Sequence, residues 1–106
     1  MAKGPENPYR VIYSGRIRQR VRTLGAEAVR LGIGQEFVDA LKVVTQKLAS
    51  EPVEWGDPQY RLHVMGLLNC HRLYSIFHVS YAVDEDRRIV YLKGIEPRSG
   101  HPLADL

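Results

Sequence analysis

The sequence predicts a single α+β domain in which a helical hairpin packs on one face of a small antiparallel sheet, in the order β-α-α-β-β-β. Two long segments carry apolar residues at intervals of three and four, which is the period of an amphipathic helix. A glycine-rich break separates these segments, and the chain after Pro58 alternates in the manner of strands. Because 106 residues suffice for one core but not for two, we expect one domain over residues 9–98. It is flanked by an N-terminal arm of residues 1–8 and a C-terminal tail of residues 99–106.

The first elements are predicted from local signals. The run from Tyr9 to Tyr13 is β-branched and aromatic, which favours a strand. Ser14 follows as a helix N-cap. An apolar stripe then predicts the first helix, with members Ile17, Val21, Leu24, Ala28 and Leu31.

A second helix begins near Gln35, after the turn Gly32-Ile33-Gly34, and Pro52 ends it. Its stripe repeats the helical period. The core predicted from both stripes comprises Ile17, Val21, Leu24, Phe37, Leu41, Val44 and Leu48.

The second half of the chain predicts strands. Residues 53–58 contain Gly56 and Pro58 and indicate a loop, with Trp55 folded over the helix ends. Strands are expected over residues 60–64, 74–83 and 88–95, with a polar turn at 84–87. Residues 67–73 either continue the first of these strands after a bulge at Gly66 or form a strand of their own. The helices cover one face, so the other face is open to solvent or ligand.

Composition excludes several classes of protein. The chain is 44% hydrophobic and 25% charged, which is ordinary for a globular protein, and its net charge is +3. Cys70 is the sole cysteine, so neither an intramolecular disulfide nor a cysteine metal site can form within one chain. Four histidines without a carboxylate at helical or hairpin spacing give no metal-ligand pattern. We therefore expect no metal and no cofactor. Residues 1–8 lack the apolar core of a leader and no segment has the length of a membrane span, which predicts a cytoplasmic protein that makes no membrane contact.

The positive charge is concentrated early in the chain. Glu27 is the one acid within a run of arginines that comprises Arg10, Arg16, Arg18, Arg20, Arg22 and Arg30. Two interpretations are open, a solvated helix face or a contact surface for phosphates or an acidic partner.

The order of elements, the arginine-rich first helix and the strand sequences together resemble the RelE/ParE toxin superfamily over roughly residues 9–98. The strand sequences are Tyr60-Arg61-Leu62, residues 76–83, Asp84-Glu85-Asp86 and the run from Arg88 to Lys93. The resemblance implies the toxin of a type II toxin–antitoxin, or plasmid stabilization, system with a cognate antitoxin as partner. Its target would be mRNA on the ribosome, as an endoribonuclease (mRNA interferase), or gyrase. Family members commonly carry a basic residue after the last strand, where this chain has Glu96 and Pro97, with Arg98 and His101 nearby.

Strand alternation selects candidate catalytic residues. Metal-free RNA cleavage needs a base, an acid and a cation for the phosphorane. If Leu62 and Val64 face the helices, their neighbours point outward, and the same reasoning turns the polar residues of the later strands to the open face. The resulting catalytic set is Arg61, His63, His78 and Lys93. RNA or partner binding is assigned to Arg16, Arg18, Arg20, Arg22, Tyr91 and Arg98.

Within that set, Arg61 stabilises the phosphate, His78 or His63 moves the proton, and Lys93 adds charge. His71 stays outside the set because the register of residues 65–73 is open. The alternative is that these are the ordinary polar residues of a half-exposed sheet.

Three functions are consistent with these residues. The first is a metal-independent mRNA endoribonuclease. The second is a noncatalytic ParE-like or orphan toxin-fold module that binds a protein partner. The third is a small basic nucleic-acid-binding domain without toxicity. The sequence makes no prediction about the oligomeric state.

Overall fold

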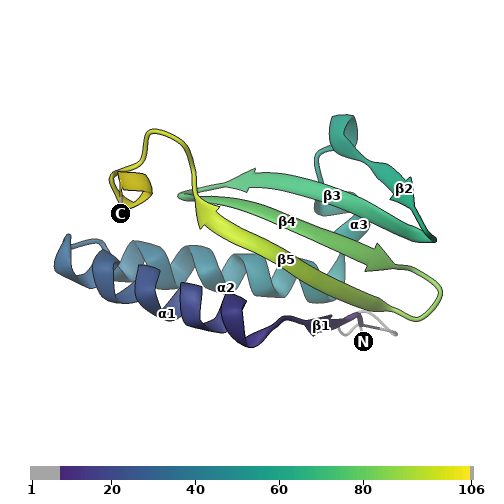
Figure 1. Ribbon diagram of the computed structural model, residues 1–106, viewed down its shortest axis with the longest axis horizontal. Helices are drawn as coiled ribbons and strands as arrows, with labels where there is room; N and C mark the ends of the chain where they lie inside the picture. Colours follow the sequence, from purple (N-terminus) through teal and green to yellow (C-terminus); the bar gives the residue numbers. More distant parts are fainter. Residues whose placement is uncertain (1–7, 106) are drawn as a thin grey trace, which may run out of the picture.

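A computed structural model describes residues 8–105 and confirms the α+β architecture (Figure 1). The predicted N-terminal arm lies outside the described residues except for Pro8. Five strands form one sheet in the order β1-β5-β4-β3-β2, with α1 and α2 side by side on one of its faces. The elements are β1 Arg10–Ile12, α1 Gly15–Arg30, α2 Gly34–Ser50, α3 Pro52–Trp55, η1 Pro58–Tyr60, β2 Leu62–Val64, β3 Leu67–Tyr74, β4 Phe77–Asp84, β5 Ile89–Pro97 and η2 Pro102–Asp105, where η marks a 3₁₀ helix.

The sheet is mixed, so the expectation of a wholly antiparallel sheet was wrong for one pair. β1 runs parallel to β5, with Arg10 opposite Ile89 and Ile12 opposite Tyr91, whereas the other pairs are antiparallel. A parallel neighbour requires a long crossover. The helical hairpin and the meander that follows it supply that crossover, since they return the chain to the side of the first strand.

Residues 67–74 form a strand of their own, β3, rather than a bulged continuation of β2. Met65 and Gly66 connect the two strands with φ angles of 54° and 81°. Positive φ at both central residues defines the type I′ turn that matches the twist of a two-residue hairpin. The turn pairs Val64 with Leu67 and thereby fixes the register that the sequence left open.

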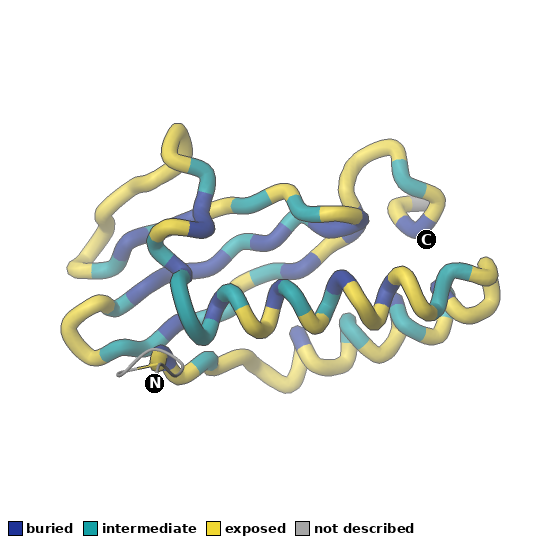
Figure 2. Tube along the Cα trace, turned by 180° about the vertical axis from the view of Figure 1, so that it is seen from behind, coloured by how far each residue is buried: buried dark blue, intermediate teal, exposed yellow. Residues whose placement is uncertain are grey.

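The helices form as the sequence predicts. The Ser14 hydroxyl accepts a hydrogen bond from the Ile17 amide at 3.2 Å and caps α1. Five of the seven predicted core residues are buried, and Val21 and Leu41 are partly buried against them. Figure 2 shows buried positions recurring along both helices on the side that faces the sheet. Leu31 is 41% exposed because it lies just beyond the last turn of α1.

The segment predicted as a loop at residues 53–58 begins instead inside a short helix, α3, which starts at Pro52. Pro52 occupies the first turn, where a missing amide costs no intrahelical hydrogen bond. Trp55 is buried, and its ring lies 6.2 Å from that of Tyr81 in a stacked arrangement. Trp55, which was expected to fold over the helix ends, therefore packs in the core against β4.

Two polar groups enter this part of the core. The Tyr81 hydroxyl donates a 2.6 Å hydrogen bond to the Pro52 carbonyl. Burial raises the pKa of the Tyr81 phenol, and burial also raises the pKa of the Cys70 thiol beside it.

These shifts predict a loss of stability at alkaline pH. In the unfolded chain, the cysteine thiol loses its proton near its ordinary pKa of about 8.5 and the tyrosine phenol near about 10. The folded chain still holds both protons at these pH values. The contribution of these two groups to the free energy of unfolding should therefore be constant at neutral pH and fall as the pH rises through those values. Urea titrations between neutral and alkaline pH measure the effect. The Tyr81→Phe variant should lose part of the slope near pH 10, and an unchanged slope would contradict the assignment.

The C-terminal residues are part of the fold. The Arg98 amide donates to the Ile76 carbonyl at 2.8 Å, and η2 then lies against α1 and β5. Leu103 is fully buried in the core. A turn of 3₁₀ helix therefore lies within residues 99–106, which were expected to be a tail.

Leu103 tests how much this closing segment contributes. Replacing it with alanine leaves a cavity in the core, and the expected loss of unfolding free energy is about 2–5 kcal/mol. Ala104→Ser, at an exposed neighbouring position, should change it by less than about 0.5 kcal/mol. Chemical denaturation of both variants measures the difference. Equal values would show that the segment does not stabilise the domain.

Among residues 8–105, no helix is both long enough and apolar enough to traverse a lipid bilayer.

Candidate functional site

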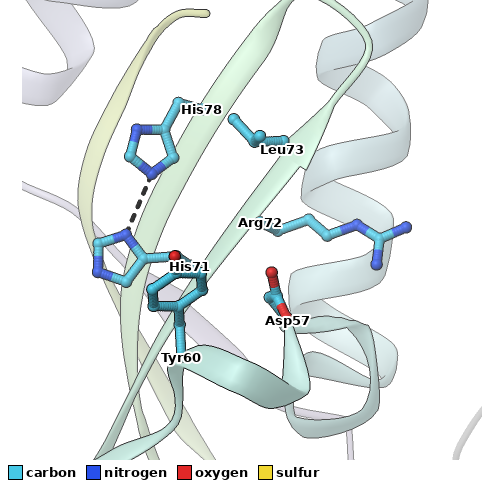
Figure 3. Close-up of a pocket in the computed structure, with 6 residues that line it drawn as sticks. All are labelled: Asp57, Tyr60, His71, Arg72, Leu73 and His78. Atoms are coloured by element: carbon cyan, nitrogen blue, oxygen red, sulfur yellow. Dashed lines mark hydrogen bonds between the residues drawn. The ribbon is translucent and has the colours of Figure 1, made fainter.

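A hollow of about 390 Å³ lies on the open face of the sheet, beside the outer edge of β3 (Figure 3). Its walls come from η1 and the residue before it, from β3 and from β4. The lining residues are Asp57, Tyr60, His71, Arg72, Leu73 and His78.

Two histidines meet in this hollow. In the register of β3 and β4, His71 lies opposite Ser80 and His78 lies opposite Leu73, so the two rings are diagonal neighbours on the same face. His71 Nδ1 lies 3.1 Å from His78 Nε2. The ring centroids are 5.2 Å apart and the ring planes differ by 25°. One ring nitrogen must therefore donate a proton and the other accept it, and Figure 3 shows the two rings pointing toward each other.

Tyr60 forms the adjoining wall. Its ring contacts that of His71 edge to face, with 6.1 Å between centroids, and the residue is 62% exposed. Asp57 fixes this arrangement, because its carboxylate Oδ1 accepts from the Gln59 amide at 2.9 Å. Its own amide donates to the His71 carbonyl at 2.8 Å. The segment that carries Tyr60 is thus anchored to the backbone of the strand that carries His71.

Arg72 lines the hollow but directs its charge elsewhere. Its side chain belongs to the helix-facing side of β3, where the guanidinium lies 5.4 Å from the centroid of the Trp55 ring. Arg72 Nη1 donates to the Trp55 carbonyl at 3.1 Å. Figure 3 shows the guanidinium pointing away from the histidines. Its contacts are with Trp55 at the end of α3, which it helps to hold in place.

Two of the predicted catalytic residues approach the pair. Lys93 is the extra residue of a bulge in β5, where Ser80 pairs with Gly94 and Tyr81 with Leu92. Its ammonium donates to Asn69 Oδ1 at 2.5 Å. Asn69 and His71 lie two residues apart on the same face of β3, about 7 Å along the strand. The ammonium of Lys93 is therefore held at Asn69, on the same face as His71, although Lys93 does not itself line the hollow.

Arg61 lines a neighbouring hollow of about 340 Å³ together with Asn69 and His71. Its guanidinium Nη2 donates to the Val53 carbonyl of α3 at 2.8 Å. The side chain predicted to bind phosphate thus ties β2 to α3 and reaches only the border of the site.

His63 does not join the other catalytic candidates. It pairs with Leu68, whose side chain faces the helices, so His63 lies on the face opposite His71 and His78. The expectation that Leu62 and Val64 face the helices was wrong. Both share the open face and are 64% and 44% exposed. The type I′ turn sets this register, and β2 extends along the sheet edge beyond the helices, so its apolar residues have no core to enter (Figure 1).

The predicted binding residues are spread over three places. Tyr91 lies on the open face opposite Ala82, and Arg98 Nη1 donates to the Ser75 carbonyl at 3.1 Å. On α1, the Arg18 guanidinium lies 5.6 Å from the centroid of the Tyr13 ring, and both Arg16 and Arg22 are exposed.

Arg20 forms an ion pair with Glu96, at 2.7 Å from Nη2 to Oε1. Glu96 lies within β5, which is longer than the strand expected over residues 88–95, and the ion pair gives this acid a partner on α1. β1 covers only the first part of β5, so Glu96 lies at a free edge that α1 can reach. The hydrogen bond to Glu96 raises the pKa of the Arg20 guanidinium.

Sequence reasoning missed His71 and Tyr60. The signal for His71 is the tight turn that pairs Tyr74 with Phe77. Once that turn is recognised, positions 71 and 78 fall on one face as diagonal neighbours. No comparable signal marks Tyr60, because its position depends on the fold of residues 57–60 over the edge of β3.

One of three comparisons with known proteins finds a similar fold. No protein-family model matches the chain, and no curated protein matches it. Among solved structures, it is similar to a chain in the crystal structure of the toxin–antitoxin complex RelBE2 from Mycobacterium tuberculosis, with a TM-score of 0.58 and 17% identity. The similarity covers 86% of this chain and 99% of that one. The chain thus has a RelE-like α+β fold, and at this level of identity the similarity shows the fold alone.

Proposed function

We propose that this chain is the toxin of a toxin–antitoxin pair and cleaves RNA without a metal ion, with His71 and His78 as its proton-transfer residues. The observation that carries the proposal is the 3.1 Å contact between ring nitrogens of the two histidines in a hollow open to solvent. The RelE-like fold, found also in a toxin–antitoxin complex, supports an antitoxin as partner.

The histidine pair offers a base and an acid at once. The central proton is the one shared between His71 Nδ1 and His78 Nε2, and the outer nitrogens are the two that face away from this contact. When both rings are neutral, the ring that donates the central proton has a free lone pair on its outer nitrogen. The other ring carries a proton on its outer nitrogen. The free nitrogen takes the proton of the ribose 2′-hydroxyl, whose oxygen attacks the adjacent phosphorus. The central proton moves to the second ring, which releases its outer proton to the departing 5′-oxygen. The products are a 2′,3′-cyclic phosphate and a 5′-hydroxyl, and the pair remains neutral with its tautomers exchanged.

The surroundings supply binding groups for RNA. Lys93, held by Asn69 on the same face as His71, is the cation that we assign to the developing phosphorane charge. The exposed Tyr60 ring gives a base a stacking surface next to His71. Both features suit an unpaired RNA strand, whose bases and 2′-hydroxyls are accessible.

A second candidate function is a noncatalytic module that binds a protein partner. It is favoured by three cations, Arg61, Lys93 and Arg98, each of which donates a hydrogen bond to an oxygen of the chain itself. Donors used in this way are not turned toward an RNA phosphate. The edge hairpin also exposes apolar side chains, since Met65 is 95% exposed. A partner could cover that edge without any reaction.

RNA cleavage distinguishes the two functions. The purified chain is incubated with single-stranded RNA in EDTA, alone and with translating ribosomes, and the new ends are analysed. We expect 2′,3′-cyclic phosphate ends, together with growth arrest when the chain is expressed in a bacterial host. Intact RNA in both settings would refute the nuclease and leave the binding module.

A further inference from the structure

We infer that His71 and His78 also form a chelating site for a divalent transition-metal ion of the zinc type, on the open face of the sheet. The inference goes beyond the proposed function and does not depend on it, since it follows from the positions of the nitrogens alone.

The distance between the two nitrogens fits a metal ion. Zinc binds imidazole nitrogen at about 2.0–2.1 Å, so two nitrogens at tetrahedral angles around one ion lie about 3.3 Å apart. His71 Nδ1 and His78 Nε2 lie 3.1 Å apart. Separating them by a few tenths of an ångström needs only small side-chain rotations, and His71 is on the exposed surface of β3.

The protonation states also allow chelation. In the hydrogen-bonded pair one central nitrogen carries a proton, whereas an ion requires lone pairs on both. The donor ring meets this requirement by moving its proton to its outer nitrogen, which is the other tautomer of neutral imidazole. Neutral rings therefore bind the ion without net proton release.

The framework holds both ligands in place. The two residues belong to adjacent antiparallel strands close to their connecting turn. The backbone of His71 is fixed by the amide of Asp57 at 2.8 Å. Holding two donors at the chelating distance removes most of the entropy cost of bringing them together, which is the gain of a bidentate site.

The site has two protein ligands. No cluster of three or more metal-ligating side chains occurs within the part of the chain that the structure describes. Water completes the coordination, and the hollow provides the room for it. Imidazole donors favour zinc, copper and nickel over magnesium and calcium, whose preferred ligands are oxygens.

Binding is tested with the tag-free chain and Zn²⁺ alone, in the absence of RNA. Isothermal titration calorimetry should show one equivalent of Zn²⁺ per chain, and the thermal midpoint should rise with Zn²⁺ concentration. His71→Asn and His78→Gln should each weaken binding by at least about tenfold, because each removes one arm of the chelate. Circular dichroism and the thermal midpoint without Zn²⁺ confirm that the variants fold.

Two other histidines provide matched controls. His63 lies on the opposite face, and His101 Nδ1 accepts from the Leu103 amide at 3.1 Å. His63→Gln and His101→Gln should leave Zn²⁺ affinity unchanged. Wild-type binding no tighter than that of the His71→Asn/His78→Gln double variant would overturn the inference, as would loss of binding in either control. Because these measurements involve no RNA, an inactive wild-type chain would refute the nuclease while leaving this result intact.

Discussion

Replacing His78 with glutamine is expected to lower the rate of RNA cleavage by roughly 10²–10⁴-fold, the usual effect of removing a general acid or base. The amide nitrogen of glutamine can occupy nearly the position of His78 Nε2 and keep a hydrogen bond to His71 Nδ1, but an amide does not exchange protons at neutral pH. The geometry of the pair is thus retained and its chemistry is lost.

Single-turnover cleavage of a short RNA measures this effect, and His63→Gln is the matched control. Both substitutions remove one histidine from a strand, but His63 is exposed and lies on the other face of the sheet. The control should keep the full rate. The double variant His71→Asn/His78→Gln should be no slower than the slower single variant, because residues that act as a unit have non-additive effects. A His78→Gln enzyme as fast as wild type would exclude the pair from the reaction.

The helical half of the fold could be predicted because its information is local. The stripes that contain Leu24 and Val44 follow the helical period, and Ser14 provides a cap within three residues of its partner. Each signal concerns neighbours in the chain, so the distant context does not alter it. The pairing of β1 with β5 was not predicted, because it joins residues about 80 positions apart in the chain. No local signal reports such a contact.

The candidate site depends on register, which alternation does not supply. A shift of one residue moves a side chain to the other face. At β2, the exposed Leu62 was taken for a core residue, and this reversed the assignment of His63. At β3, the open register left His71 out of the set, although it is the partner of His78. Two turns, at residues 65–66 and 75–76, decide both cases, because each sets the pairing of the two strands that it connects.

Phe77 connects the site to the core, because it is the residue before His78 and points to the opposite face of β4. It is fully buried, and its ring meets that of Phe37 on α2 edge to face, with 5.3 Å between centroids. The aromatic pair therefore joins the helical layer to the strand that carries His78.

Phe77→Ala is expected to lower the free energy of unfolding by about 3–5 kcal/mol through lost burial and the cavity left behind. That is a large share of the roughly 5–15 kcal/mol typical of a domain. Val29→Ala, at a 70% exposed position of α1, should change it by less than about 0.5 kcal/mol. Urea denaturation followed by circular dichroism measures both.

The milder Phe77→Leu variant separates packing from the aromatic contact. In a double-mutant cycle with Phe37→Leu, the coupling between the two rings should be about 0.5–1.5 kcal/mol, the range for edge-to-face aromatic pairs. Because Phe77→Leu still fills most of the space, it should fold and retain the His71–His78 contact, so its RNA cleavage should stay close to that of wild type. A coupling energy of zero would show that α2 and β4 are held together by burial alone, without a specific contribution from the ring geometry.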